Sequence, residues 1–193
     1  MIESCILVIA LHGASGNGSS MHTALGSSLP PSVEVVTPSS PTKVWDITAN
    51  SYSQRQILTV ARASSCDTKI LVGHSNGAYM ATALQCRFPR IFDGVFAVNG
   101  WANISRCPLT PTSQRLVIHG ADDTLIPRSG QLVPPVSWLF PTRFWGDGKT
   151  TTRQVRNQTA GKQRFQRVRW VVRDGGHGWD DNQRLADWMR RFL

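Results

Sequence analysis

Ser75 lies between two glycines in the segment GHSNG at 73–77. Apolar residues 70–72 precede this segment, and apolar residues at helical spacing follow it. The G-x-S-x-G arrangement is typical of a nucleophilic serine on a tight turn between a strand and a helix. We expect glycine at 73 and 77 because side chains there would collide with the neighbouring strand and helix. The segment therefore predicts a serine hydroxyl that projects above the end of a sheet.

A serine hydroxyl is a weak nucleophile, so it needs a general base, and the base needs an acid to orient it. His177 is the candidate base, because it follows the last predicted strand within the glycine-rich segment DGGHGW at 174–179. The candidate acids are Asp122 and Asp123, which follow the predicted strand RLVIH at 115–119. Either aspartate could hold the base, while the other would accept hydrogen bonds from backbone N–H groups of the turn.

A second glycine-rich loop, HGASGNG at 12–18, follows the apolar run CILVIAL at 5–11. It matches neither a dinucleotide-binding loop nor a phosphate-binding P-loop, because it lacks G-x-G-x-x-G and ends without GK[ST]. A loop whose backbone N–H groups stabilise a developing oxyanion fits better. We interpret His12 and His74 as loop-shaping or substrate-lining residues, and His119 as structural.

The elements that must position these residues alternate between strand and helix. Strands are predicted at 5–11, 33–36, 70–72, 94–98, 115–119 and 165–173, with helices that begin near Ser19 or Ser20, at Ser53 and at Asp180. This alternation predicts an α/β fold, a doubly wound, mostly parallel sheet with helices on both faces. We find no internal repeat or linker, so residues 1–193 are predicted to form a single domain.

Four segments together resemble the α/β-hydrolase superfamily, and most closely the polyhydroxybutyrate depolymerases and feruloyl esterases. They are LHGASGNGSS at 11–20, GHSNGAYMATALQCRFPRIFDGVFAVNG at 73–100, VIHGADDTLIP at 117–127 and GGHGW at 175–179. The resemblance spans most of the chain and implies an α/β-hydrolase fold and a serine esterase.

Carried over by position, the resemblance implies Ser75 as nucleophile, His177 as base and Asp123 as acid, with Asp122 as the alternative. It also implies that the backbone N–H groups of Asn76 and Ala14 form the oxyanion hole. The expected reaction is hydrolysis of carboxylic esters through an acyl-enzyme, with no cofactor and no metal. At 193 residues the chain is shorter than many such enzymes, so we expect a small lid or none.

The identity of the substrate stays open. Trp101 and Trp179 are candidate substrate-lining residues, because both lie in loops at strand ends. Polyesters and feruloyl or acetyl esters are candidate substrates. The same residues would serve a thioesterase, a lipid esterase or a peptidase, and a non-catalytic binding protein could retain the fold.

The chain carries a formal net charge of +9, and many of its arginines lie between 153 and 191. We interpret this as a solvated basic surface, with association to an anionic surface or polymer as the alternative. No nucleic-acid-binding motif accompanies the charge. No apolar run approaches the roughly 20 residues that span a bilayer.

The first residues form a poor signal peptide, because Glu3 is acidic and no basic region precedes the apolar run. Whether the protein is exported or cytoplasmic therefore stays open. The four cysteines show no zinc-binding spacing. We interpret Cys5 as a small buried apolar residue, and Cys86 and Cys107 as a possible disulfide.

Overall fold

The computed structural model describes residues 5–100, 110, 112–126 and 168–193. Its strands are β1 (Ile6–Leu11), β2 (Val33–Val36), β3 (Thr68–His74), β4 (Gly94–Val98), β5 (Gln114–Gly120) and β6 (Val168–Arg173). Its helices are α1 (Gly18–Leu25), α2 (Tyr52–Ala63), α3 (Asn76–Arg87) and α6 (Asn182–Met189). No helix among these residues is both long enough and apolar enough to cross a bilayer.

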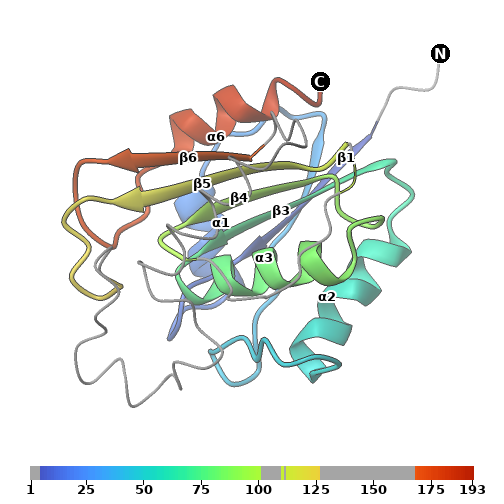
Figure 1. The fold of residues 1–193 in the computed structure, drawn as a ribbon. Helices are drawn as coiled ribbons and strands as arrows, with labels where there is room; N and C mark the ends of the chain where they lie inside the picture. Colours follow the sequence, from blue (N-terminus) through green and yellow to red (C-terminus); the bar gives the residue numbers. More distant parts are fainter. Residues whose placement is uncertain (1–4, 101–109, 111, 127–167) are drawn as a thin grey trace.

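The strands form one six-stranded sheet in the order β2-β1-β3-β4-β5-β6, and every neighbouring pair is parallel. The arrowheads therefore point the same way in Figure 1. The carboxyl ends of the strands meet along one edge of the sheet, where loops from distant parts of the sequence come together. The predicted doubly wound parallel sheet is confirmed.

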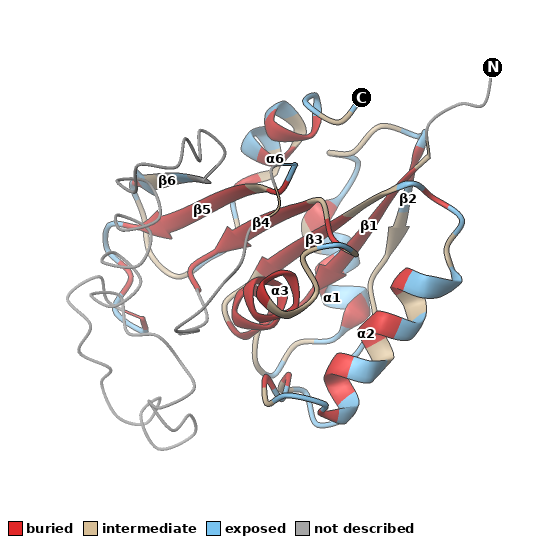
Figure 2. Ribbon diagram, turned by 45° about the vertical axis from the view of Figure 1, so that its right-hand side comes forward, coloured by how far each residue is buried: buried red, intermediate tan, exposed pale blue. Residues whose placement is uncertain are grey.

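Helices cover both faces of the sheet, as the alternating pattern predicted. Alternate side chains of β1 point to opposite faces, and all six are buried. The face that carries Leu7 and Ile9 packs with α2 and α3, whereas the face that carries Val8 packs with α1 and α6. Figure 2 shows the buried strands between these two helix layers.

The central helix α3 explains why the segment around Ser75 needs its glycines. A Cβ atom at Gly77 would lie 2.1 Å from the carbonyl oxygen of Leu11 in β1. A Cβ atom at Gly73 would lie 2.4 Å from the carbonyl oxygen of Gly77 at the start of α3. Because neither backbone atom can move aside without displacing its element, larger residues would separate α3 from the sheet.

The predicted helix starts were shifted by one to three residues. Asn17 caps α1 and forms a capping box with Ser20, because the Asn17 side chain accepts from the Ser20 N–H. Ser51 rather than Ser53 caps α2. The cap position of α6 is Asp181, whose side chain makes no capping hydrogen bond.

The interpretation of Cys5 as a small buried apolar residue was wrong. Cys5, just before β1, forms a disulfide with Cys66, just before β3, across a separation of 61 residues. Since β1 and β3 are neighbours in the sheet, the bond ties their amino ends together. Cys86 is also disulfide-bonded. Cys107, its predicted partner, lies outside the described residues. The expectation of a small lid or none concerns the long connections at 101–109 and 127–167, which also lie outside them.

Candidate active site

Ser75 is the turn between β3 and α3. Its φ of 52° lies in the left-handed region, which is uncommon for a residue with a side chain. The turn is fixed by the Ser75 N–H, which donates to the Val98 carbonyl at the end of β4 (2.8 Å). The hydroxyl is therefore presented at the carboxyl edge of the sheet by a strained but anchored backbone.

His177 joins this hydroxyl to a carboxylate. Its Nε2 lies 2.8 Å from Ser75 Oγ, and its Nδ1 lies 2.8 Å from Asp123 Oδ2. An ionised carboxylate can only accept, so Nδ1 carries the proton and donates it to Asp123. In the neutral ring Nε2 is then free to accept from the Ser75 hydroxyl, which is the arrangement a general base needs.

Of the two candidate acids, Asp123 is the one that contacts His177. Its side chain is buried, and its Oδ1 accepts from the N–H groups of Leu125 (3.0 Å) and Ile126 (2.8 Å). Burial raises the pKa of Asp123, but the hydrogen bonds from His177 and Ile126 outweigh it and leave the pKa below its usual value. Asp122 is exposed. The carboxylate facing His177 is thus held in its ionised form.

Asn99 was not among the predicted site residues, yet it connects the two loops that carry Asp123 and His177. It is fully buried at the end of β4, with a φ of 53°. Its Oδ1 accepts from the N–H of Gly120 (2.8 Å), and its Nδ2 donates to the carbonyls of Gly176 and Gly178 (both 3.3 Å). One side-chain amide therefore sets the spacing between the acid loop and the base loop.

Arg173 supports the same loop from its other side. Its guanidinium donates to the carbonyl of Gly178 (2.6 Å) and to the buried carboxylate of Asp181 (2.9 Å). Arg173 is the last residue of β6. The structure buries it because the ion pair with Asp181 compensates for the loss of hydration.

His74 holds the backbone of His177. Its Nε2–H donates to the His177 carbonyl (2.6 Å), so the proton resides on Nε2. Burial lowers the pKa of His74 to about 4, and the ring is neutral at physiological pH. Of its two predicted roles, loop shaping is the one these contacts support.

The loop after β1 lies directly over Ser75. A Cβ atom at Gly13 would lie 3.3 Å from the Cβ of Ser75. Within the described part of the chain, neither the Ala14 N–H nor the Asn76 N–H donates to another protein group. Both predicted donors are thus without an acceptor among the described residues, as an oxyanion hole requires.

Trp45 was not among the predicted site residues, yet the segment around it supports both predicted donors. The Asn76 side chain exchanges hydrogen bonds with the backbone N–H and carbonyl of Trp45. The Trp45 indole donates to the His12 carbonyl (2.9 Å). His12 itself is buried and donates from Nδ1 to the Gly13 carbonyl, while its Nε2 accepts from the Ser40 N–H. Burial lowers the pKa of His12. His12 therefore shapes the loop from inside.

The two predicted tryptophans have different outcomes. Trp179 is partly exposed, and its ring lies edge-on to His74 with centroids 6.4 Å apart. Its indole N–H donates to the Asn182 side chain (2.8 Å). It is therefore placed beside the site as a candidate wall. Trp101 lies outside the described residues.

Within the described ranges, a single group of side chains has metal-ligand geometry. Its members Cys5, Glu34 and Cys66 have ligand atoms within 4.8 Å of one another. The two sulfur atoms are bonded to each other, so the oxidised protein offers only the Glu34 carboxylate there. The group lies at the amino ends of its strands, away from Ser75.

Comparison with known proteins gives the fold its name. No protein-family model matches the sequence, and no curated protein is significantly similar to it. Solved structures do match along nearly the whole chain. SOBER1 of Arabidopsis thaliana is 15% identical with a TM-score of 0.67, and covers 97% of this chain and 98% of its own. Acyl-protein thioesterase 2 of Zea mays is 16% identical with a TM-score of 0.68, over 96% and 93%.

A third match, esterase PE8, is 18% identical with a TM-score of 0.60, over 97% of this chain and 92% of its own. At such low identity these matches establish the fold. Together with the strand order, they show that the chain has the α/β-hydrolase fold. The matched proteins include esterases and a thioesterase, and the narrower resemblance to polyhydroxybutyrate depolymerases and feruloyl esterases stays a prediction.

Proposed function

We propose that this protein is a serine hydrolase that cleaves carboxylic esters through an acyl-enzyme. The observation that carries the proposal is the continuous relay from Ser75 Oγ through His177 to Asp123, with two hydrogen bonds of 2.8 Å. The same three groups in the same roles make a serine hydroxyl reactive in unrelated folds. The α/β-hydrolase fold, shared with esterases, supports the reaction class.

In the proposed reaction Ser75 Oγ attacks the ester carbonyl while His177 Nε2 takes its proton. The resulting oxyanion would accept from the backbone N–H groups of Ala14 and Asn76, each worth about 3 kcal/mol in comparable sites. His177 then returns the proton to the leaving alcohol, and the acyl group stays on Ser75. Water activated by His177 releases the acid. Asp123 stabilises the imidazolium and keeps its orientation.

The next question is which acyl and alcohol groups the substrate carries. Polyester oligomers and feruloyl or acetyl esters are the proposed substrates, on the basis of the sequence resemblance. A thioester is the second candidate, because one of the matched structures is named an acyl-protein thioesterase. The relay itself does not select the leaving group, so rates must decide.

The test is a panel of p-nitrophenyl acetate, methyl ferulate, 3-hydroxybutyrate oligomers and an acyl thioester. We expect oxygen esters to give the highest kcat/KM. Ser75→Ala and His177→Ala should each lower kcat about 10⁴- to 10⁶-fold on the best substrate, with unchanged folding by circular dichroism. Near-wild-type rates in either variant would contradict the proposed site. A clear preference for the thioester would replace the ester assignment.

A further inference from the structure

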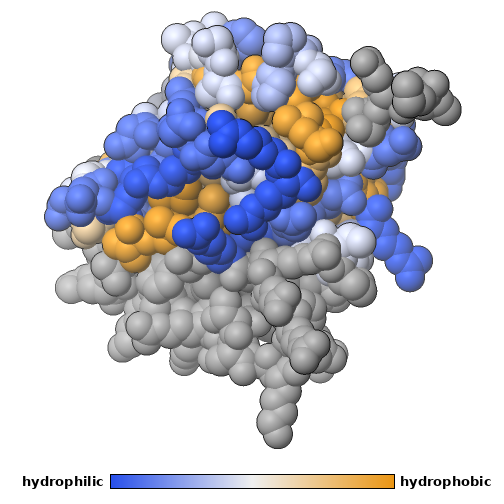
Figure 3. All heavy atoms as spheres, turned by 90° about the horizontal axis from the view of Figure 1, so that it is seen from above, coloured by the Kyte–Doolittle hydropathy of each residue, from blue (hydrophilic) through white to orange (hydrophobic). Residues whose placement is uncertain are grey.

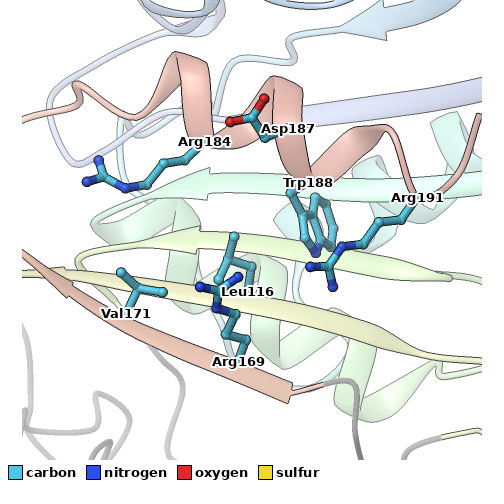
Figure 4. Close-up of a pocket in the computed structure, with 7 residues that line it drawn as sticks. All are labelled: Leu116, Arg169, Val171, Arg184, Asp187, Trp188 and Arg191. Atoms are coloured by element: carbon cyan, nitrogen blue, oxygen red, sulfur yellow. The ribbon is translucent and has the colours of Figure 1, made fainter.

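A basic groove of about 230 Å³ lies between α6 and strand β6, on the opposite side of the fold from α2 and α3. Figure 3 looks onto this side of the molecule, where strongly hydrophilic residues border apolar surface. Figure 4 shows the side chains that line the groove, which are Leu116, Arg169, Val171, Arg184, Asp187, Trp188 and Arg191.

The groove exists because α6 covers the middle of the sheet and not its edge. Trp188 is buried against β4, where a Cβ atom at Gly94 would lie 2.8 Å from its ring. In the described sheet β6 is the last strand, and its residue Arg169 pairs in register with Leu116 of β5. Among the described residues this leaves a groove beside α6 at the edge of the sheet, with Leu116, Val171 and Trp188 as its apolar floor.

Arginines line this floor from both sides. Arg191 extends from the end of α6 and Arg169 from β6, and both are exposed (Figure 4). In the part of the chain that the structure describes, neither of them forms an ion pair. Arg184 is paired with Asp181 (2.8 Å), and Asp187, the acid of the groove, is paired with Arg190 (2.9 Å). Arg169 and Arg191 therefore bring two guanidinium groups without ion-pair partners among the described residues to one groove, whose acid, Asp187, is already paired with Arg190.

We propose that this groove binds a phosphate monoester that carries an apolar group. A monoester has a charge of about −1.5 to −2 at pH 7, which matches two guanidinium groups, and its oxygens suit their paired donors. The apolar group would lie on the floor formed by Leu116, Val171 and Trp188. Such a ligand could be a soluble organic phosphate or the headgroup of phosphatidic acid, since both present the same chemistry.

The groove is separate from the proposed catalytic site. Leu116 and Arg169 lie near the amino ends of β5 and β6, whereas Ser75, Asp123 and His177 gather at the carboxyl ends. Loss of ligand binding here should leave ester hydrolysis unchanged. The two proposals can therefore fail independently.

The test is calorimetric titration of the full chain with phenyl phosphate, inorganic phosphate and phenol. We expect phenyl phosphate to bind about tenfold or more tightly than inorganic phosphate, because only it can use the apolar floor, and phenol not to bind measurably. Arg169→Gln/Arg191→Gln should weaken phenyl phosphate binding at least about tenfold. The matched control is Arg62→Gln/Arg90→Gln, which removes two exposed arginines elsewhere and should bind as the wild type does.

Equal losses in the two double variants would show that only net charge matters, and would overturn the proposal. Unchanged binding in Arg169→Gln/Arg191→Gln would overturn it as well, as would equal affinity for inorganic and phenyl phosphate. Thermal melts and p-nitrophenyl acetate hydrolysis must match the wild type in both variants, so that loss of binding is not loss of folding.

The source of the phosphate is decided by co-sedimentation with vesicles. Binding to phosphatidylcholine vesicles that contain phosphatidic acid, but not to phosphatidylcholine alone, would assign the lipid headgroup, provided that Arg169→Gln/Arg191→Gln abolishes this binding. Phenyl phosphate binding without vesicle binding would assign a soluble organic phosphate. Absence of both would end the proposal.

Discussion

The position of the Ser75 hydroxyl depends on a backbone conformation that few residues with side chains adopt. A φ of 52° turns the chain sharply between β3 and α3, and the N–H of the same residue anchors the turn to β4. This turn could be predicted from the sequence, because close backbone contacts on either side of the serine require glycine at 73 and 77. His177 could equally be predicted, because that residue follows the last strand of a parallel sheet.

At the residue scale the acid is the sharpest test of the relay. Asp123→Asn should lower kcat about 10⁴-fold, because the amide no longer holds His177 in the tautomer that accepts the serine proton. Asp122→Asn provides a matched control on the adjacent, exposed residue and should retain the wild-type rate. Steady-state kinetics on p-nitrophenyl acetate would measure both, and a larger loss in the Asp122 variant would reverse the assignment.

His74 gives a prediction about pH and stability. Its pKa is about 4 in the folded protein, whereas an exposed histidine has a pKa of about 6.5. The unfolded chain therefore binds the proton first as the pH falls. The contribution of neutral His74 to the free energy of unfolding is complete above about pH 6.5 and is lost between there and about pH 4. The total loss is on the order of 3 kcal/mol.

Urea unfolding at pH 7.5 and pH 4.5 measures this effect. The wild type should lose more stability between the two pH values than His74→Gln, whose side chain can still donate a hydrogen bond but does not titrate. An equal loss in the two proteins would mean that His74 is not the buried neutral group.

At the scale of elements, the site depends on how loops at the ends of β4, β5 and β6 are connected. Asn99 bonds the Gly120 N–H on one side and the Gly176 and Gly178 carbonyls on the other. Sequence reasoning placed these loops at one edge but missed Asn99. Polar residues are common at strand ends, so the residue type alone does not indicate a role in the site. The partners of Asn99 also lie up to 79 positions away in the sequence.

Asn99→Gly separates the role of the side chain from that of the backbone. Glycine accepts the positive φ, so the turn should persist while the three hydrogen bonds are lost. We expect a destabilisation of about 1–3 kcal/mol and a fall in kcat of about 10- to 100-fold with little change in KM. Thermal denaturation and kinetics would measure the two effects, and an unchanged kcat would show that the loops hold their spacing without Asn99.

Two strands were predicted with their observed bounds, whereas the three predicted helix starts were each shifted, for a physical reason. Burial on both faces makes the strand at Gly94–Val98 an uninterrupted apolar run, and its bounds agreed with the prediction. Caps depend on single hydroxyl or amide groups, and the segments before α1 and α2 offer several. Asn17 and Ser51 were selected by local backbone geometry, which composition does not specify.

At the scale of the whole molecule, two kinds of long-range constraint could not be predicted from sequence alone. Cysteine spacing leaves the pairing open, and the bond between Cys5 and Cys66 became evident only with the neighbouring strands in place. The position of Arg169 and Arg191 on one groove was likewise open until β6 and α6 came together. That residues 1–193 form one domain stays a prediction.

The disulfide should contribute to the stability of the whole molecule. A bond that closes a loop of 61 residues restricts the unfolded chain, and its loss typically costs about 2–4 kcal/mol. Cys5→Ser/Cys66→Ser should therefore unfold at lower urea concentration while retaining kcat, because the bond lies at the opposite end of the strands from Ser75. Equal unfolding midpoints in the wild type and the variant would argue against a stabilising role.

The central claim is that His177 makes Ser75 nucleophilic. Labelling with a fluorophosphonate probe, followed by peptide mass spectrometry, tests it most directly. We predict one adduct, on Ser75, in the wild type, no adduct in Ser75→Ala, and labelling slowed by orders of magnitude in His177→Ala. An unlabelled wild-type protein, or a label on any other residue, would contradict the account.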